Sequence, residues 1–271
     1  MSSSSGEVPG GRLLVDEPAP HVARLTISNP GKRGALDRGL LDSLPATLAG
    51  LNAHCVVLTG EGSTFSAGYD ISDLGGPDLT ALADEAERLV ANPFDAALDA
   101  LAGHPCPTIA ALNGHAIGGG LELALACDLR LAADSIRLGM PPGKLGLVYS
   151  HTGIRRFIEA IGGPRTRELF LVGRRIEAAT ALSWGLVNAV VDAELLATEA
   201  LALAAEIAAN APLAQRGNKH VIGAVLGGST TLSSDVQREL LELRDASLHS
   251  EDFREGVRAF AEKRAPQWRG R

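Results

Sequence analysis

Three consecutive glycines, Gly118 to Gly120, stand between two apolar segments and are followed closely by Glu122. The preceding segment, 108–112, is a short apolar run typical of a buried strand, and the following segment, 121–127, is rich in Ala and Leu and predicts a buried helix. Glycines at such a junction tolerate strained dihedrals and let a ligand approach the backbone closely. Because a helix N-terminus has unpaired amide N–H groups and a partial positive charge, this junction is suited to holding a developing oxyanion.

Glu122 has almost entirely apolar neighbours in the sequence. Carboxylates are rarely buried without a partner or a task, so we interpret Glu122 as a candidate catalytic group. The alternatives are a packing turn for the glycines and a first-turn acid favoured by the helix dipole for Glu122. No Lys-Ser/Thr pair follows the glycines, which excludes a Walker loop. The spacing of Gly114 and Gly118 to Gly120 also differs from the dinucleotide-binding fingerprint.

The composition is that of an ordinary globular protein, with 271 residues, 45% hydrophobic and 21% charged. The length predicts one large domain or one domain with an appendage. A formal charge of −7 argues against a nucleic-acid partner. No apolar run reaches about 18 residues, so we expect no membrane span. Residues 1–11 are rich in Ser and Gly and have no apolar core, which predicts a disordered leader and not a signal peptide.

The three cysteines, Cys55, Cys106 and Cys127, all lie in apolar stretches. An odd number of buried thiols indicates a reducing compartment, and we expect a cytoplasmic protein. There is no CxxC or HxxxH pair. We therefore expect no metal site.

Residues 12–193 mix strand and helix patterns and predict an α/β fold. The expected strands cover residues 12–15, 22–27, 55–59, 108–112, 128–133, 136–138 and 187–191. Besides the helix at 121–127, the expected helices cover residues 153–161, 164–172 and 178–184. A further helix begins at the N-cap Asp37 and carries four leucines, and Pro45 inside it is expected to kink or split it. The polar stretch 72–104 is either a lid or a plain surface excursion, and residues 140–152 are expected to form an irregular loop.

From Glu194 onward only helical patterns remain. Apolar residues recur three and four positions apart in four segments, namely 195–209, 212–225, 232–248 and 251–263. Four amphipathic helices leave more apolar surface than one edge of a core can cover. We therefore predict that 194–271 is a helical region used for self-association.

Several motifs in the same order resemble the crotonase (enoyl-CoA hydratase/isomerase) superfamily over residues 12–271. They are Ser66–Ile71, Ile109–Asp128, Gly173–Ile176, Trp184–Asn188, Glu251–Gly256 and Phe260–Lys263. The resemblance implies a crotonase-type spiral of ββα units over residues 12–193, with an acyl-CoA site. It also implies an α-helical C-terminal region, 194–271, that assembles trimers or dimers of trimers.

The resemblance further implies an acyl-CoA thioester as substrate, with coenzyme A as part of that substrate and no other cofactor. Family members hold the thioester carbonyl between two backbone N–H groups, at positions matching Tyr69 and Gly119. Such donors stabilise the enolate oxygen, and removing one typically costs about 3 kcal/mol. Only the amide of Tyr69 is required, so its ring is expected to line the pocket. Glu122 matches one of two carboxylates that activate water.

The remaining substrate-binding positions also follow from the resemblance. Asp70, Ile71 and Ser72 match positions that usually skirt the adenine and pantetheine of coenzyme A, and Ala67 and Gly118 are further substrate-binding positions. Lys32 and Arg33 could reach the phosphates of coenzyme A, as could Lys263 from a neighbouring subunit, beside Phe260. For each of these cations a solvated surface charge is the alternative. His115, beside the glycines, is expected to be a packed histidine and not a catalyst.

Two departures from the family pattern bear on the reaction. Pro142 stands where the second carboxylate falls in hydratases, and proline can neither donate nor accept a proton. The loop 145–152 is similar to that of the methylmalonyl-CoA decarboxylase branch, which places a tyrosine near Tyr149. Tyr149, Ser150 and His151 either bind a substrate carboxylate or supply a proton, and the alternative is a loop whose hydroxyls only satisfy backbone groups.

Three functions follow from these features. A lyase resembling enoyl-CoA hydratase and acting on a 2-enoyl-CoA comes first, because Glu122 is retained. A malonyl- or methylmalonyl-type decarboxylase comes second, because it needs an oxyanion hole but no second carboxylate. A catalytically weak CoA-binding member is the third. An RNA-binding role, known in one branch of the superfamily, is disfavoured by the net charge.

Overall fold

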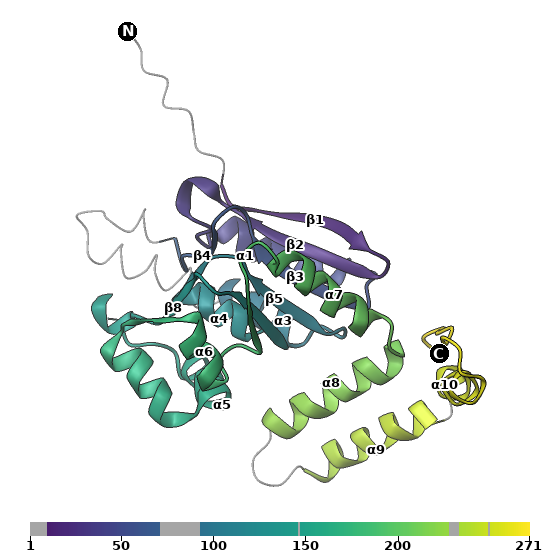
Figure 1. Cartoon of the computed structure of the whole chain (residues 1–271). Coiled ribbons are helices and arrows are strands. Elements are labelled where there is room, and N and C mark those ends of the chain that lie inside the picture. Colours follow the sequence, from purple (N-terminus) through teal and green to yellow (C-terminus); the bar gives the residue numbers. More distant parts are fainter. Residues whose placement is uncertain (1–9, 71–92, 146, 228–232, 249) are drawn as a thin grey trace.

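The computed structural model describes residues 10–70, 93–145, 147–227, 233–248 and 250–271. Its larger sheet has six strands (Figure 1). In spatial order they are β1 (Arg12–Ala19), β2 (Val22–Ser28), β3 (Cys55–Gly60), β5 (Thr108–Leu112), β7 (Leu129–Ala133) and β10 (Ala189–Val191). β1 and β2 pair antiparallel, and the later neighbours pair in parallel. All five residues of β5 are buried, as expected for a parallel strand covered on both faces.

A second sheet of short strands lies beside the first. Its order is β4 (Thr64–Ser66), β6 (His115–Ile117), β8 (Arg137–Gly139) and β9 (Arg175–Glu177). The chain passes from the larger sheet to the smaller one and then into a helix, as in β5, β6 and α4 (Gly119–Leu125). β7 and β8 likewise precede α5 (His151–Arg167). The repetition of this ββα unit confirms the predicted spiral.

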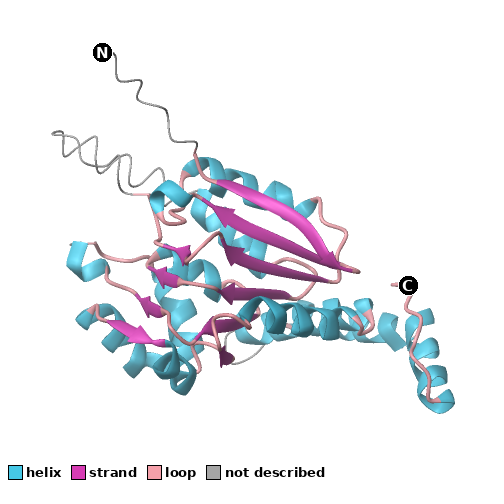
Figure 2. Cartoon of the chain, turned by 45° about the horizontal axis from the view of Figure 1, so that its top comes forward, coloured by secondary structure: helices cyan, strands magenta, loops and turns pink. Residues whose placement is uncertain are grey.

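Helices cover the larger sheet on both faces (Figures 1 and 2). α7 (Leu196–Ala208) packs across five of its strands, β1, β2, β3, β5 and β7. Its buried residues recur every four positions, which gives it one apolar stripe towards the sheet. On the other side lie α1 (Arg38–Ala49) and α3 (Asp95–Ala102), which pack on each other.

Pro45 was expected to kink or split α1, and the helix runs through it without a split. Asp37 caps the helix by accepting a hydrogen bond from the amide of Leu40, as predicted. Proline inside a helix costs about 3 kcal/mol. The buried leucines of α1 are each at most 2% exposed and contribute roughly 1.5–3 kcal/mol each, which outweighs that cost.

The elements between β8 and β10 refine the sequence-based boundaries. The stretch expected to be an irregular loop contains the short helix η4 (Pro142–Leu145), and α5 begins at His151, two residues before the predicted start. α5 is interrupted at Gly162, whose φ of 73° is not helical, and continues into the π-helical turn η5 (Glu168–Val172). α6 (Ala178–Trp184) has the predicted bounds. The turn η1 (Pro30–Lys32) precedes α1.

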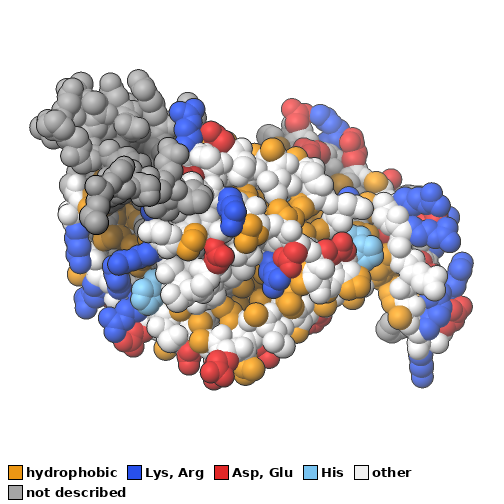
Figure 3. Space-filling model, turned by 90° about the horizontal axis from the view of Figure 1, so that it is seen from above, with side chains coloured by type: hydrophobic (Ala, Val, Ile, Leu, Met, Phe, Trp, Pro, Cys, Tyr) orange, Lys and Arg blue, Asp and Glu red, His pale blue; other side chains and the backbone are white. Residues whose placement is uncertain are grey.

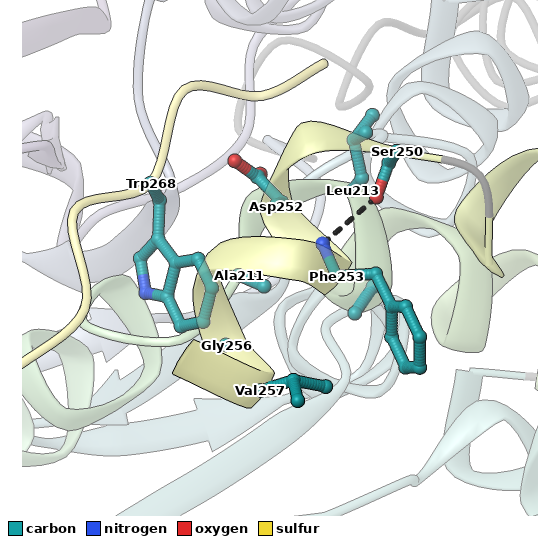
Figure 4. Close-up of a pocket in the computed structure, with 9 residues that line it drawn as sticks. Ala211, Leu213, Ser250, Asp252, Phe253, Gly256, Val257 and Trp268 are labelled. Carbon is teal, nitrogen blue, oxygen red and sulfur yellow. Dashed lines mark hydrogen bonds between the residues drawn. The ribbon is translucent and has the colours of Figure 1, made fainter. Parts of the chain in front are cut away.

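The chain ends in three helices, α8 (Pro212–Gly227), α9 (Ser234–Leu248) and α10 (Glu251–Glu262). α8 and α9 pack side by side, and α10 lies at the end of the molecule away from β4 (Figure 1). The last residues fold back onto α10, because the amides of Arg269 and Gly270 donate to the buried carboxylate of Asp252. Trp268 closes an apolar pocket of about 360 Å³ there (Figure 4).

The described residues also bear on two expectations from the sequence. Cys55, Cys106 and Cys127 are free and buried, as predicted. No helix within the described ranges is long and apolar enough to cross a membrane. On the face seen in Figure 3, hydrophobic side chains reach the surface between acidic and basic ones.

The turn between β5 and β6 lies directly on the chain before β4, and we expect Gly114→Ala to destabilise the fold. A Cβ at Gly114 would lie 2.1 Å from the carbonyl oxygen of Ser63 and 2.5 Å from Cα of Thr64. Overpacking of this kind typically costs about 1–3 kcal/mol. Urea denaturation at fixed protein concentration measures the free energy of unfolding.

Gly39→Ala in α1 is the matched control. Its Cβ would meet only Asp37 Oδ1 at 3.7 Å, so this variant should be unchanged or slightly more stable. Equal stability of the two variants would contradict the close approach at Gly114.

Candidate active site

The glycine run forms the junction of β6 and α4, as predicted. Gly118 has φ 57° and ψ −127°, and its amide donates to the carbonyl oxygen of Gly139 on β8 at 2.9 Å. The carbonyl oxygen of Gly118 accepts from the amides of Leu121 and Glu122. The helix therefore begins at Gly119, whose N–H has no acceptor within the helix.

A second amide comes from the loop after β4. Leu36 donates to the carbonyl oxygen of Gly68 at 2.8 Å and accepts from the amide of Asp70 at 3.1 Å. Because extended backbone alternates its polar groups, the N–H of Tyr69 points away from Leu36. Gly68 has φ 91°, and a Cβ there would lie 3.2 Å from the nitrogen of Gly119. The loop thus touches the start of α4, which brings the Tyr69 and Gly119 segments together.

These two segments line one small pocket of about 90 Å³. Five of the predicted site residues lie in its wall: Ala67, Tyr69, Gly118, Gly119 and Tyr149. The rest of the lining is glycine and apolar side chains, namely Gly68, Ile117, Met140, Pro141, Pro142, Leu145 and Leu147. Pro142 is thus in the wall, at the position where the resemblance placed a second carboxylate.

Glu122 lies beside this pocket and is only 2% exposed. The hydroxyl of Tyr149 donates to its Oε2 at 2.5 Å. Burial raises the pKa of Glu122, and the hydrogen bond from Tyr149 and the charge of Arg156 oppose that rise. A carboxyl group whose pKa is shifted towards neutrality is suited to general base and acid catalysis.

The hydroxyl of Tyr69 extends this arrangement. It lies close enough to Tyr149 and Glu122 for both to act on its pKa, so the three side chains are neighbours around the hydrogen bond between Tyr149 and Glu122. Burial, followed by the charge of Glu122, raises the pKa of Tyr69, and burial also raises the pKa of Tyr149. The prediction assigned only the amide of Tyr69 and missed this contact. A signal was available, since Tyr69 and Tyr149 are the only tyrosines in the sequence.

The N-terminus of α5 fixes Tyr149 in place. The hydroxyl of Ser150 caps this helix by accepting from the amide of Gly153 at 3.1 Å. A Cβ at Gly153 would lie 2.6 Å from Cε1 of Tyr149 and 2.9 Å from Oε1 of Glu122. Glycine therefore leaves the space that both side chains occupy. Ser150 satisfies a backbone group, which is the alternative considered for this loop, and His151 is exposed.

The predicted contacts with coenzyme A are placed unevenly. Lys32 forms an ion pair of 2.6 Å with Asp70, next to Tyr69. Arg33 is exposed, and its carbonyl oxygen accepts from the amide of Ala67. Lys263 is exposed and follows α10, which lies at the end of the molecule away from β4 (Figure 1). Ile71, Ser72 and the side chain of Phe260 lie outside the described residues.

Two further expectations concern histidine and metal. His115 is exposed and not packed, because it begins the short strand β6, and its Nδ1 accepts from the amide of Arg137 on β8. Among the described residues, no group of three or more His, Cys, Asp or Glu side chains is arranged to hold a metal ion.

The chain is similar to known proteins over nearly its whole length. A family model described as enoyl-CoA hydratase/isomerase matches residues 17–271. A probable enoyl-CoA hydratase of Mycobacterium tuberculosis (strain CDC 1551 / Oshkosh) is 35% identical over 251 residues, which cover 91% of this chain and 94% of the relative. The 2,3-dehydroadipyl-CoA hydratase of Escherichia coli (strain K12) is 33% identical, with coverage of 92% and 96%. The crystal structure of an enoyl-CoA hydratase from Bacillus anthracis has a TM-score of 0.87 at 34% identity and covers 96% of this chain and 100% of that chain.

The buried tyrosines make a prediction about alkaline pH. Free tyrosine ionises near pH 10, whereas burial raises the pKa of both Tyr69 and Tyr149 in the folded protein. The unfolded chain therefore releases two phenolic protons at lower pH than the folded one, so the free energy of unfolding should fall as the pH rises above about 10. Tyrosinate absorbance should appear in one step together with loss of the circular dichroism of the helices.

Protein denatured in urea is the reference, and its tyrosines should ionise near pH 10. Tyr69→Phe should halve the absorbance change, because one tyrosine then remains. A gradual rise near pH 10 in protein that is still folded would show that these hydroxyls are not buried as described.

Proposed function

Because the chain belongs to the enoyl-CoA hydratase/isomerase family, we propose that it is a lyase that adds water to the double bond of a 2-enoyl-CoA thioester. The observation that carries this proposal is the buried carboxylate of Glu122, bonded to Tyr149 beside a pocket lined by Tyr69 and Gly119. Coenzyme A is part of the substrate, and the reaction needs no further cofactor.

The amides of Tyr69 and Gly119 act first, as donors to the thioester oxygen. Negative charge moves onto this oxygen when a nucleophile adds at C3, and preorganised donors in an apolar pocket stabilise it. The pocket walls supply few competing polar groups. The two amides therefore promote formation of the enolate and do not themselves exchange a proton.

Glu122 and Tyr149 divide the proton transfers. Glu122 accepts one proton from water while the water oxygen bonds to C3. Tyr149 donates its hydroxyl proton to C2 of the enolate and regains one from Glu122 along their 2.5 Å hydrogen bond. The net change is the addition of one water molecule, and both residues return to their starting states. In this scheme Tyr149 takes the acid role that Pro142 cannot perform.

The remaining predicted residues bind the coenzyme A part. In this proposal the pantetheine chain passes Gly118, Ala67 and Asp70 and continues past Ile71 and Ser72. Support comes from Ala67 and Gly118, which line the pocket, and from Asp70, which follows Tyr69 directly. The phosphates then face Lys32 and Arg33, two cations on the turn that bonds to this loop.

Decarboxylation of a malonyl-type thioester is the second candidate. It is favoured by one observation, that the described pocket wall contains Tyr149 and no Asp or Glu. Loss of carbon dioxide leaves an enolate that the two amides would stabilise and Tyr149 would protonate. Hydration ranks first because the charge of Glu122, bonded to the same tyrosine, would repel a substrate carboxylate.

Two variants distinguish these reactions. Glu122→Gln cannot accept a proton from water, and Tyr149→Phe cannot supply one to C2. Each should lower kcat/KM for hydration of crotonyl-CoA by at least about 100-fold. Incubation with crotonyl-, methylmalonyl- and ethylmalonyl-CoA, read by mass spectrometry, identifies the product.

Pro142→Glu is the complementary variant. It places a carboxyl group at the pocket wall. Introduced alone, it should raise the hydration rate above that of the wild-type protein, and combined with Tyr149→Phe it should raise the rate above that of Tyr149→Phe alone. If methylmalonyl-CoA is decarboxylated and Tyr149→Phe lowers that turnover more than Glu122→Gln does, the second candidate holds. If no thioester of the panel is converted, the protein is the catalytically weak CoA-binding member.

We also propose that the helices after residue 194 assemble the protein into a trimer or a dimer of trimers, in the cytoplasm. Large apolar side chains on α8, α9 and α10 are 47–63% exposed, namely Ile222, Val225, Leu226, Leu241, Phe253 and Val257. Lys263 and Phe260 would then reach the coenzyme A site of a neighbouring subunit. Burial of these apolar faces supplies the driving force.

Light scattering tests this assembly. The expected mass is three or six times the 28.1 kDa of the chain. Val225→Glu combined with Leu226→Glu should lower the mass, because charges on an apolar interface oppose association. A concentration-independent monomer mass for the wild-type protein would refute the assembly.

A further inference from the structure

Arg156, on the second turn of α5, lies between two carboxylates from different helices. Its Nη2 is 3.1 Å from Oδ1 of Asp99 on α3, and its Nε is 3.7 Å from Oε1 of Glu122 on α4. The arginine side chain is 24% exposed, whereas Glu122 is buried. The guanidinium thus reaches from the surface to the interior carboxylate behind the pocket.

The Nε atom of Arg156 is buried, and within the described ranges it has no hydrogen-bond partner. Every other buried side-chain nitrogen or oxygen of the described residues has a hydrogen-bond partner. A buried donor without an acceptor is costly, and arginine cannot relieve the cost by losing its proton. The acceptor towards which it lies is Oε1 of Glu122, less than 1 Å beyond hydrogen-bond distance.

The two oxygens of Glu122 therefore have separate surroundings. Oε2 accepts the hydrogen bond of Tyr149, whereas Oε1 faces Arg156 and lies next to Gly153. We propose that Arg156, anchored by Asp99, is a positioning residue that keeps the Glu122 carboxylate ionised and holds Oε1 apart from the Tyr149 hydroxyl. The consequence of this role for proton transfer from water to Glu122 rests on the function proposed above.

The groups that face Glu122 come from several elements. Tyr149 approaches from the loop before α5, Tyr69 from the loop after β4, and Asp95 from α3. The pKa of Asp95 is in turn affected by Asp99 on α3 and by His151 at the start of α5. Burial and the charge of Asp95 raise the pKa of Glu122, whereas Tyr149 and Arg156 lower it. Removing the positive charge must therefore raise this pKa, and the carboxylate is then lost at higher pH.

The two tyrosines of the chain provide a readout that does not depend on turnover. Protein labelled with 3-fluorotyrosine has two fluorine resonances, and Tyr69→Phe assigns the one from Tyr149. Since Tyr149 bonds to Glu122, its resonance should follow the ionisation of that carboxyl group. Glu122→Gln should abolish this inflection, which assigns it.

Arg156→Gln should move the inflection to higher pH by about one unit or more. Arg156→Lys keeps the charge and should restore most of the wild-type position. Arg155→Gln is the matched control: it removes the same charge one residue away, from a side chain that is 58% exposed and pairs with Glu159. It should leave the inflection unchanged. If Arg156→Gln does not fold, Arg156→Met fills the same space without the charge and serves instead.

Enzyme kinetics give the second readout. The acidic limb of the pH profile of kcat/KM should move to higher pH in Arg156→Gln in parallel with the fluorine inflection, and Arg156→Lys should restore it. An unmoved inflection in Arg156→Gln or Arg156→Met, or an equal shift in Arg155→Gln, would overturn the role of Arg156. A shifted inflection in a protein that converts no thioester would instead overturn the proposed function and leave the positioning role intact.

Discussion

A carboxylate that is 2% exposed, as Glu122 is, must be stabilised by groups that stay in place when water is excluded. The first turn of α4 contributes its dipole, Tyr149 a hydrogen bond and Arg156 a positive charge. These groups come from α4, α5 and the loop directly before α5, so the relative placement of the two helices determines the protonation behaviour of the site. The spiral of ββα units is what holds the two helices against each other.

Close backbone approach is the second requirement. Gly68 lets the Tyr69 loop touch the start of α4, and Gly153 lets α5 pack over Glu122 and Tyr149. A single methyl group at either position would enter space that the site already uses. The glycines therefore act on the site through steric exclusion, whereas Gly118 acts through its positive φ at the strand end.

The sequence predicted the larger elements and the centre of the site, because both leave local patterns. Buried strands such as β3 and β5 are apolar runs, and the glycine run marks the start of α4. The strands β4, β6 and β9 have three residues each, too few for an alternation to be recognised. Arg156 contacts Glu122, 34 positions away in the sequence, and Asp99, 57 positions away. No local sequence pattern carries information about contacts over such separations.

The apolar character of the pocket is consistent with Pro142 in place of the second carboxylate that the family resemblance implies. Two carboxylates side by side in a dry pocket repel each other, and one of them must be protonated or solvated. With Pro142 in the wall, that repulsion is absent, and a neutral phenol can stand next to Glu122. The raised pKa of Tyr149 keeps its hydroxyl protonated. One buried carboxylate, one positive charge behind it and one phenol beside it thus lie together, which is the arrangement that the proposed proton transfers require.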